Sequence, residues 1–493
     1  MRPHPHLYEI NTWVWLKELS GKYSRQICLG DVPAQEWDDL KSKGFDCVWL
    51  MGVWQRSPAG RLIAVDHPQL RREYDRALPN WKPSDVVGSP YSIRAYIPDP
   101  NLGTWQDLDA VLEILHQRGM KLILDFVPNH TALDHEWVRS HPDYYIQGTV
   151  TDYERSPEDF LRVGMQDRVL YLARGKDPYF PAWTDTVQLN YFNEETRSAL
   201  LHQIQSLAQH CDGVRCDMAM LVVNHIFRKT WEPFVGAHPY PETEFWVEAV
   251  SRIPEFIWIA EVYWDLEWEL QQLGFQFTYD KRLYDRLRHS SAQEVNLHLT
   301  ADVTYQSGLV RFLENHDEPR SAGIFKDEQL RACATLLATL PGMRLYHQGQ
   351  LEGKRTRIPV QLAGQQEEPV NQAISVMYER LLSIADDDVF HVGEWTRLLV
   401  VADGDSTSEN LIAYQWSWEK DFRMVVVNLS SVPSRGHVQV KTLLSKDPSA
   451  SFRLLDQVTQ RLYTFPPDAL SQHGLLIQLP SYGAHVFSGR TNS

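Results

Sequence analysis

The sequence predicts an α/β fold of the (β/α)8 TIM-barrel class, with a small domain inserted after strand 3 and a C-terminal antiparallel β-sandwich. Two patterns predict the barrel. Short apolar runs typical of buried parallel strands recur along the chain, and amphipathic helical stretches lie between them. The expected strands are 8–16, 45–51, 121–127, 213–218, 256–262, 275–280, 308–315 and 342–348.

The helical stretches carry recognisable start and stop signals. Residues 104–118 place their leucines on one face, with Thr104 as the N-cap and Gly119 as the stop. Residues 194–208 repeat this pattern after Asn193, another N-cap candidate. Helices of this kind cover the faces of a parallel sheet, which supports eight repeated strand and helix units.

Two regions break the alternation. Residues 131–187 are polar, rich in Asp, Pro and Tyr, and too long for a simple loop, so we expect a small inserted domain. After residue 390, short strands alternate with turn signals, which predicts the β-sandwich. The expected sandwich strands lie within 410–418, 422–430, 436–442, 474–480 and 483–488. The predicted domains are a barrel at 1–130 and 188–385, an insertion at 131–187 and a sandwich at 390–493.

Composition narrows the partners. The 493 residues carry a net charge of −16, which disfavours a nucleic-acid partner and an anionic membrane surface. No apolar run is long enough to span a bilayer, and MRPHPHLYEI lacks the apolar core of a signal peptide. The five cysteines show no CxxC spacing, so we expect reduced thiols and a cytoplasmic location. The sequence does not indicate an oligomeric state.

Polar residues gather where the expected strands end, which is the face that carries barrel active sites. Arg215 and Asp217 are two positions apart in one strand and therefore share a face. A structural ion pair would explain that strand alone, whereas four strands carry polar ends, which favours a catalytic site. The candidates are Asp125, Asn129 and His130 after the third strand, Arg215 and Asp217 on the fourth, Glu261 on the fifth, and His316 and Asp317 after the seventh.

The residue types favour acid–base chemistry on an acetal. Two carboxylates can serve as nucleophile or base and as general acid. The chain lacks a GxGxxG after a strand, a Walker loop, an HExxH and a GxSxG. A metal site, the rival interpretation, would use more of the acids and histidines as ligands at close spacing. We therefore expect that no cofactor is required.

Four segments resemble the conserved regions of the α-amylase superfamily, glycoside hydrolase family 13, in the same order and at the same strands. They are DFVPNH (125–130), GVRCDMAML (213–221), IAEVYW (259–264) and FLENHD (312–317). YSIRAYIPDPNLGTWQDL (91–108) resembles the segment before the first region, and VQLNYFNEETR (187–197) resembles the region that ends the inserted domain.

The resemblance implies roles for the acids. Asp217 would be the nucleophile that forms a glycosyl ester, and Glu261 would be the general acid and then the base. Asp317 would stabilise the oxocarbenium-like transition state. Arg215 would keep Asp217 ionised by lowering its pKa, while Glu261 needs a raised pKa.

The resemblance also implies binding residues. Tyr91, His130 and His316 would hold the same glucosyl ring, and Asp125 would be structural, tied to Arg215. Asn129 matches a position that often binds structural calcium, but 131–187 offers no convincing partner ligands, so calcium stands as an option.

The chain departs from the family pattern at Met220 and Leu221, where endo-α-amylases usually carry Lys-His. These residues either pack in the core or alter the leaving-group side of the site. The second interpretation predicts a preference for short substrates, with Trp183 and Tyr179 narrowing the cleft into a pocket.

Three functions remain open. The first is a retaining α-glycoside hydrolase that acts on short oligosaccharides or α-glucosides. The second is a transglycosylase, glucan-modifying transferase, isomerase or phosphorylase that uses the same nucleophile. The third, a non-catalytic sugar-binding relative, is disfavoured because all three acids are present.

Overall fold

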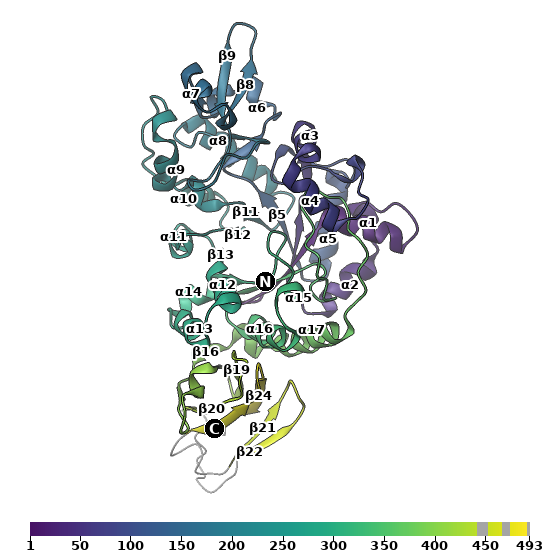
Figure 1. Ribbon diagram of the computed structural model, residues 1–493, viewed down its shortest axis with the longest axis vertical. Coiled ribbons are helices and arrows are strands. Elements are labelled where there is room, and N and C mark those ends of the chain that lie inside the picture. Colours follow the sequence, from purple (N-terminus) through teal and green to yellow (C-terminus); the bar gives the residue numbers. More distant parts are fainter. Residues whose placement is uncertain (441–451, 466–473, 491–493) are drawn as a thin grey trace.

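The computed structural model describes residues 1–440, 452–465 and 474–490. Its centre is a closed barrel of eight parallel strands, with the inserted segment above it and the C-terminal sheets below it (Figure 1). Each expected strand is present, which confirms the predicted fold class. The barrel strands, in order around the ring, are β1 (His6–Asn11), β2 (Cys47–Met51), β5 (Lys121–Phe126), β11 (Gly213–Cys216), β12 (Ile257–Ala260), β13 (Phe277–Tyr279), β14 (Leu309–Arg311) and β15 (Met343–His347).

The first strand ends earlier than the sequence predicts. The range 8–16 was expected, but β1 ends at Asn11 and helix α1 (Thr12–Lys22) follows directly. The side chain of Asn11 accepts a hydrogen bond from the Val14 amide at 3.4 Å, so it caps this helix. Glu9 consequently lies near the C-terminal end of β1, on the same face as Leu7, which packs inside the barrel.

Helices surround the barrel (Figure 1). The two predicted helices are present, and Thr104 caps the first of them by accepting a bond from the Asp107 amide. Gly119, after this helix, has a φ of +67°, which favours glycine. The outer helices are α2 (Ala34–Ser42), α5 (Trp105–Gln117), α8 (Glu194–Leu207), α9 (Asn224–Trp231), α10 (Phe245–Arg252), α11 (Glu267–Gln272), α12 (Lys281–His289), α13 (Ala292–His298), α14 (Val303–Ser307), α15 (Ser321–Ile324), α16 (Asp327–Thr339), α17 (Gln372–Ala385) and α18 (Val389–Val392).

The connection between β2 and β5 holds elements that the sequence analysis missed. A hairpin of β3 (Trp54–Arg56) and β4 (Ile93–Pro98) encloses helices α3 (Pro58–Asp66) and α4 (Pro68–Ala77). Ser57 accepts a bond from the Gly60 amide and caps α3. In Figure 1 these two helices lie at the upper right, whereas α11, which follows β12, lies on the left.

The segment between β5 and α8 forms small antiparallel sheets. Strand β6 (His130–Ala132) pairs with β10 (Thr186–Gln188), so the two ends of the insertion are joined. Its outer part is the sheet β7 (Gln147–Gly148), β9 (Val169–Ala173) and β8 (Phe160–Gly164), with helices α6 (Trp137–Ser140) and α7 (Val150–Arg155).

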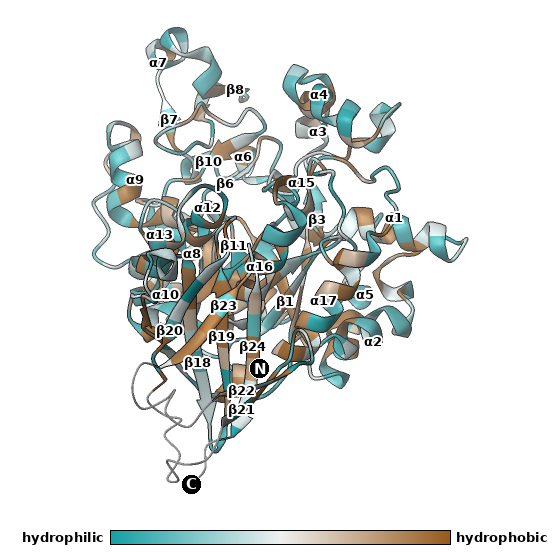
Figure 2. Ribbon diagram, turned by 60° about the horizontal axis from the view of Figure 1, so that its bottom comes forward, coloured by the Kyte–Doolittle hydropathy of each residue, from teal (hydrophilic) through white to brown (hydrophobic). Residues whose placement is uncertain are grey.

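Two antiparallel sheets form the C-terminal part, as predicted. Residues from both sheets, such as Phe422 and Ile477, share one apolar core. Figure 2 shows hydrophobic residues among the strands of these sheets. Residues 441 and 442 of the expected strand 436–442 lie outside the described residues. The larger sheet is β16 (Glu394–Arg397), β18 (Leu411–Trp418), β19 (Asp421–Asn428), β24 (Ala484–Arg490), β21 (Phe452–Asp456) and β22 (Leu462–Phe465); the smaller is β17 (Val400–Val401), β20 (Ser434–Val438) and β23 (Leu475–Leu479).

All five cysteines are free thiols, and four of them are buried. Within the described ranges, none of the helices combines the length and the apolar character that crossing a membrane requires.

Candidate active site

A cavity of about 450 Å3 lies at the C-terminal mouth of the barrel. The predicted residues Tyr91, His130, Asp217, Glu261 and Asp317 all line it. The other predicted site residues, Asp125, Asn129, Arg215 and His316, are buried behind these side chains. The structure therefore brings the candidates from four strands together.

Arg215 is the central cation of the site. Its Nη1 donates a hydrogen bond to Oδ1 of Asp217 at 2.7 Å, and its Nη2 lies 2.7 Å from Oε2 of Glu261. The guanidinium carbon lies 5.0 Å from the centre of the Tyr91 ring, and the side chain is only 1% exposed. One buried guanidinium thus holds two carboxylates close to each other.

The chain turns sharply after Asp217. Met218 adopts the left-handed conformation, with φ of +40°, and its amide donates a bond to Oε2 of Glu261 at 2.8 Å. Gly213, at the start of the same strand, has no room for a side chain, because a Cβ would lie 2.4 Å from the carbonyl oxygen of Ile257. Close packing of β11 against β12 therefore places Asp217 next to Glu261.

Glu261 is held at both oxygens. Oε1 accepts a hydrogen bond from the Tyr263 hydroxyl at 2.7 Å, while Oε2 contacts the Met218 amide. Burial raises the pKa of Glu261; Arg215 opposes this rise and Asp217 adds to it. This raised pKa suits a general acid.

The pKa of Asp217 differs from the sequence-based prediction. Arg215 acts in the predicted direction, but burial raises the pKa of Asp217 by more than Arg215 lowers it, and Asp317 adds to the rise. Because two buried acids share one guanidinium, we expect Asp217 and Glu261 to titrate as a pair that holds one proton. Arg215 lies 2.7 Å from an oxygen of each acid, so it favours the ionised form of both Asp217 and Glu261.

His316 joins two carboxylates. Its Nδ1 lies 2.5 Å from Oε1 of Glu9, and its Nε2 lies 3.0 Å from Oδ2 of Asp317 and 2.7 Å from the Tyr91 hydroxyl. Burial opposes its charge, but Asp317 and Glu9 together raise the pKa of His316 well above its usual value. Burial by itself would raise the pKa of Asp317. His316 outweighs this effect, so the pKa of Asp317 falls below its usual range. The side chain of Asp317 is 48% exposed and faces the cavity.

Asp125 is fully buried beside the site. Oδ2 accepts a bond from the Gly52 amide at 2.9 Å, and Oδ1 lies 3.9 Å from Nη1 of Arg215. Burial raises its pKa to about 6, which Arg215 counters. Asp125 thus contacts Arg215 and the Gly52 amide without lining the cavity.

His130 is a neutral ring that lines the cavity. Nε2 lies 3.1 Å from the carbonyl oxygen of Tyr91, and Nδ1 lies 3.3 Å from the amide nitrogen of Asn129. Burial lowers the pKa of His130 to about 4. Because Asn129 donates to Nδ1, the proton belongs on Nε2, where it bonds to the Tyr91 carbonyl.

The side-chain amide of Asn129 forms hydrogen bonds with the side-chain amide of Gln188. Its Nδ2 donates to Oε1 of Gln188 at 3.1 Å, and Nε2 of Gln188 donates to Oδ1 of Asn129 at 3.0 Å. Among the described residues, no group of three or more His, Cys, Asp or Glu side chains could hold a metal ion. The donor set around Asn129 therefore does not fit the carboxylate-rich shell that calcium prefers.

Met220 and Leu221 pack in the interior rather than along the leaving-group side. They are 0% and 3% exposed, and neither lines the cavity. The physical reason is the turn at Met218, after which the 3-10 turn η5 (Ala219–Val222) is wholly buried. The prediction of short substrates thus loses its support from these two residues.

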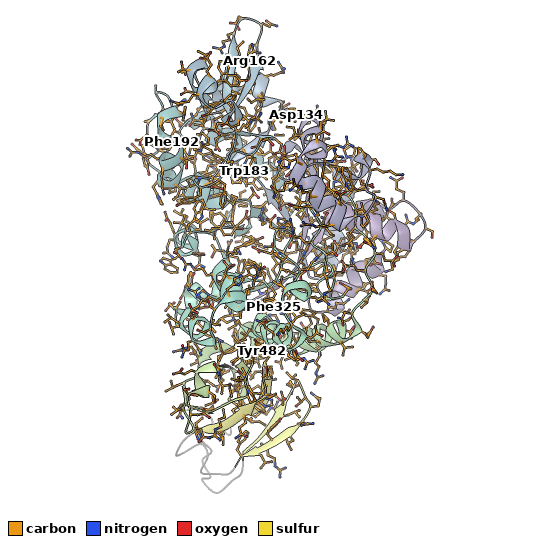
Figure 3. The ribbon with its side chains drawn as sticks, in the orientation of Figure 1. Asp134, Arg162, Trp183, Phe192, Phe325 and Tyr482 are labelled. Atoms are coloured by element: carbon orange, nitrogen blue, oxygen red, sulfur yellow. The ribbon has the colours of Figure 1, made fainter. Side chains whose placement is uncertain are left out.

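The two aromatic residues expected to narrow the cleft differ in position. Trp183 lies where the insertion meets the barrel (Figure 3). It lines the cavity, and its ring centre lies 5.1 Å from that of His130. Tyr179 is 59% exposed and packs edge-on against Trp264, with 4.9 Å between the ring centres. Tyr179 does not line the cavity.

Two parts of the site escaped the sequence analysis. Glu9 was missed because the expected strand extended to residue 16, which placed Glu9 at the wrong end of it. A signal was present, because Glu9 is a charged residue on the inward face of a strand. Helices α3 and α4 were also missed, and residues of both line the cavity, such as Ile63 and Leu70, together with His67 between the two helices.

The chain resembles known proteins in sequence and in structure. It is 27% identical over 425 residues to the alpha-amylase MalA of Haloarcula japonica, covering 82% of this chain and 53% of that protein. It is 26% identical over 316 residues to an alpha-glucosidase of Apis mellifera, covering 54% of each. The chain spans about half the length of these curated relatives.

Solved structures show the same fold. The maltogenic alpha-amylase AmyB of Thermotoga neapolitana matches with a TM-score of 0.68 at 20% identity, over 99% of each chain. The alpha-amylase of Geobacillus thermoleovorans, in complex with acarbose, matches with a TM-score of 0.66 at 18% identity, also over 99% of each chain. The family model described as the alpha-amylase catalytic domain matches residues 34–378, which is most of the sequence. This match, together with the barrel and its three acids, shows that the chain belongs to the α-amylase family.

Proposed function

We propose that this protein is a retaining α-glycoside hydrolase that removes a terminal glucosyl unit from short oligosaccharides or α-glucosides. One observation carries the proposal: Asp217 and Glu261 line the same cavity and lie 2.7 Å from the two terminal nitrogens of Arg215. Retaining enzymes need their two carboxyl groups about 5–5.5 Å apart, closer than inverting enzymes do. A shared guanidinium supports that short separation.

The chemistry follows from these positions. An oxygen of Asp217 attacks the anomeric carbon, forming an ester as the glycosidic bond breaks, and Glu261 gives its proton to the leaving oxygen. Glu261, now ionised, takes a proton from water, which attacks the same carbon and releases Asp217. Asp317 stays ionised at neutral pH because its pKa is held low, so it can stabilise the positive charge of the transition state.

The wall made by α3 and α4 supports a substrate with a free end. Around the barrel, β2 and β12 are separated by β5 and β11, so α3 and α4 and the general acid stand on different sides of the mouth. Gly60, Ile63, His67, Gln69 and Leu70 line the cavity on the α3–α4 side. A sugar chain held by Asp217 and Glu261 meets this wall beyond its terminal ring, whereas its leaving group points toward Glu261.

Product analysis tests the proposal. We expect kcat/KM to be higher on maltose, maltotriose and 4-nitrophenyl α-glucoside than on soluble starch. We expect no turnover of a maltoheptaoside that is blocked at its non-reducing end. Asp217→Asn should abolish turnover while the melting temperature is kept, and azide should restore turnover of the nitrophenyl substrate by Glu261→Ala. Rapid loss of starch viscosity before glucose accumulates would show internal cleavage and contradict the terminal mode.

Transfer to a second sugar is the alternative supported by one surface. The exposed Tyr179 packs against the half-buried Trp264, three residues after Glu261, and aromatic faces can stack on an acceptor sugar. The same assays with added acceptor sugars or phosphate separate the reactions. Products that contain the acceptor would indicate transfer, and binding without turnover would indicate a non-catalytic relative.

A further inference from the structure

We propose that Glu9 is a positioning residue for this reaction, which holds the imidazole of His316 in one orientation and in its doubly protonated form. The inference rests on the proposed glycosidase function. Glu9 stands on β1, outside the four segments that resemble the family, and it does not line the cavity.

The contacts fix the His316 ring from both ends. Glu9 is fully buried, and Oε1 lies 2.5 Å from Nδ1 of His316. The opposite ring nitrogen faces Asp317 at 3.0 Å and the Tyr91 hydroxyl at 2.7 Å. The Trp49 ring packs edge-on against the imidazole, with 5.4 Å between the ring centres. The ring can therefore neither turn nor shift without losing one of these partners.

The two carboxylates determine the proton count of the ring. An ionised carboxylate only accepts hydrogen bonds, and a neutral imidazole carries a single N–H. Glu9 at Nδ1 and Asp317 at Nε2 are both acceptors, so the imidazolium is the form in which the ring donates to the two carboxylates at once. The raised pKa of His316 agrees with this geometry.

A purely structural role for Glu9 would lower the stability of the fold, because it buries a charged group. Its Oε2 has no hydrogen-bond partner within the described part of the chain, and a buried carboxylate with an unpaired oxygen is unfavourable. An apolar or amide side chain would fill the same space at lower cost. A role in holding His316 accounts for the charge.

Other charged groups surround this pair. His347 on β15 faces Glu9, and with His316 it outweighs burial and lowers the pKa of Glu9. On the other side, Asp217 and Asp125 attract the imidazolium, and Arg215 acts on Glu9 by lowering its pKa. Glu9 is the carboxylate at hydrogen-bond distance from Nδ1, so its removal is the most direct way to neutralise the ring.

The consequence concerns Asp317. A charged His316 holds Asp317 ionised and fixed at the rim of the cavity, where positive charge develops on the sugar. Without Glu9, the ring loses its proton at lower pH and is free to turn, so Asp317 loses a cationic partner. The cost to the reaction should grow as the pH rises.

The experiment compares Glu9→Gln, Glu9→Asp and Asp46→Asn in the full chain. Asp46→Asn is the matched control, because Asp46 is also a buried carboxylate but precedes β2 at the opposite end of the barrel. For Glu9→Gln we expect the ratio of its kcat/KM to that of the wild type to fall steadily as pH rises. Glu9→Asp should recover part of this loss, and Asp46→Asn should give a ratio that does not depend on pH.

NMR titration gives a readout that needs no turnover. The His316 ring signal, assigned by comparison with His316→Gln, should titrate about 1–3 pH units lower in Glu9→Gln than in the wild type, the usual effect of one close opposite charge. If Glu9→Gln does not fold, Glu9→Asp carries the same test with a smaller shift. An unchanged His316 titration with a pH-independent activity ratio would overturn the proposal. Absence of wild-type turnover would instead refute the proposed function and leave this titration as the test of Glu9.

Discussion

Replacement of Tyr263 by Phe removes one hydrogen bond from Glu261, the proposed general acid, and nothing else at that oxygen. The Tyr263 hydroxyl donates to Oε1 of Glu261 at 2.7 Å, while Oε2 keeps the Met218 amide and Arg215. A bond donated to a carboxylate favours the ionised form and lowers the pKa. The variant should therefore raise the pKa of Glu261.

The size of this shift follows from the type of bond. A hydrogen bond to a charged group contributes about 1.5–3 kcal/mol, and one pKa unit corresponds to about 1.4 kcal/mol. We expect the pKa of Glu261 to rise by about 1–2 units. A general acid must be protonated to act, so the alkaline limb of the kcat/KM profile should move to higher pH by that amount.

The assay is the pH dependence of kcat/KM on maltose, whose leaving group needs a proton. A 4-nitrophenyl glucoside, which needs little acid assistance, serves as the control substrate and should show a smaller shift. Tyr145→Phe is the control variant, because it removes a buried tyrosine hydroxyl that bonds to Thr131, away from the cavity. An alkaline limb that stays in place or moves to lower pH, in a folded variant, would refute the reasoning.

Three further predictions concern stereochemistry, metal and stability. The first sugar released should keep the α configuration, which proton NMR of fresh product detects; release of the β anomer would mean inversion. Dialysis against a chelator should leave kcat and the melting temperature unchanged, because Gln188 occupies the Asn129 amide; a fall that calcium reverses would contradict this. Glu314→Gln should cost about 3 kcal/mol in urea unfolding at neutral pH, because the buried Glu314–Arg320 pair, 2.7 Å apart, lowers the pKa of Glu314 from 4.5 to about 2. A lowered pKa stabilises the fold above pH 4.5, so the difference should shrink as pH falls toward 2, and a constant difference would exclude this linkage.

Local sequence determined the elements whose signals are short-range. Buried parallel strands need apolar residues on both faces, so all eight barrel strands stood out as apolar runs. The helix after Thr104 was predictable because its cap lies within three residues of its start. The sequence identified Asp217, Glu261 and Asp317 because a barrel of parallel strands brings the C-terminal ends of all its strands to one mouth. This holds for any length or conformation of the loops.

Only the tertiary structure decided how these residues act on one another. Glu9 and His316 are 307 positions apart, and their contact depends on how β1 closes the ring against β15. Met218 adopts a left-handed backbone conformation, and the residues after this turn are buried. A methionine rarely adopts this conformation, and no local sequence pattern predicts it. The net pKa of Asp217 depends on burial set by distant elements as well as on its neighbour Arg215. A sequence shows which charges are present, but the water removed from them and the distances between them come from packing, and these two quantities set the chemistry of the site.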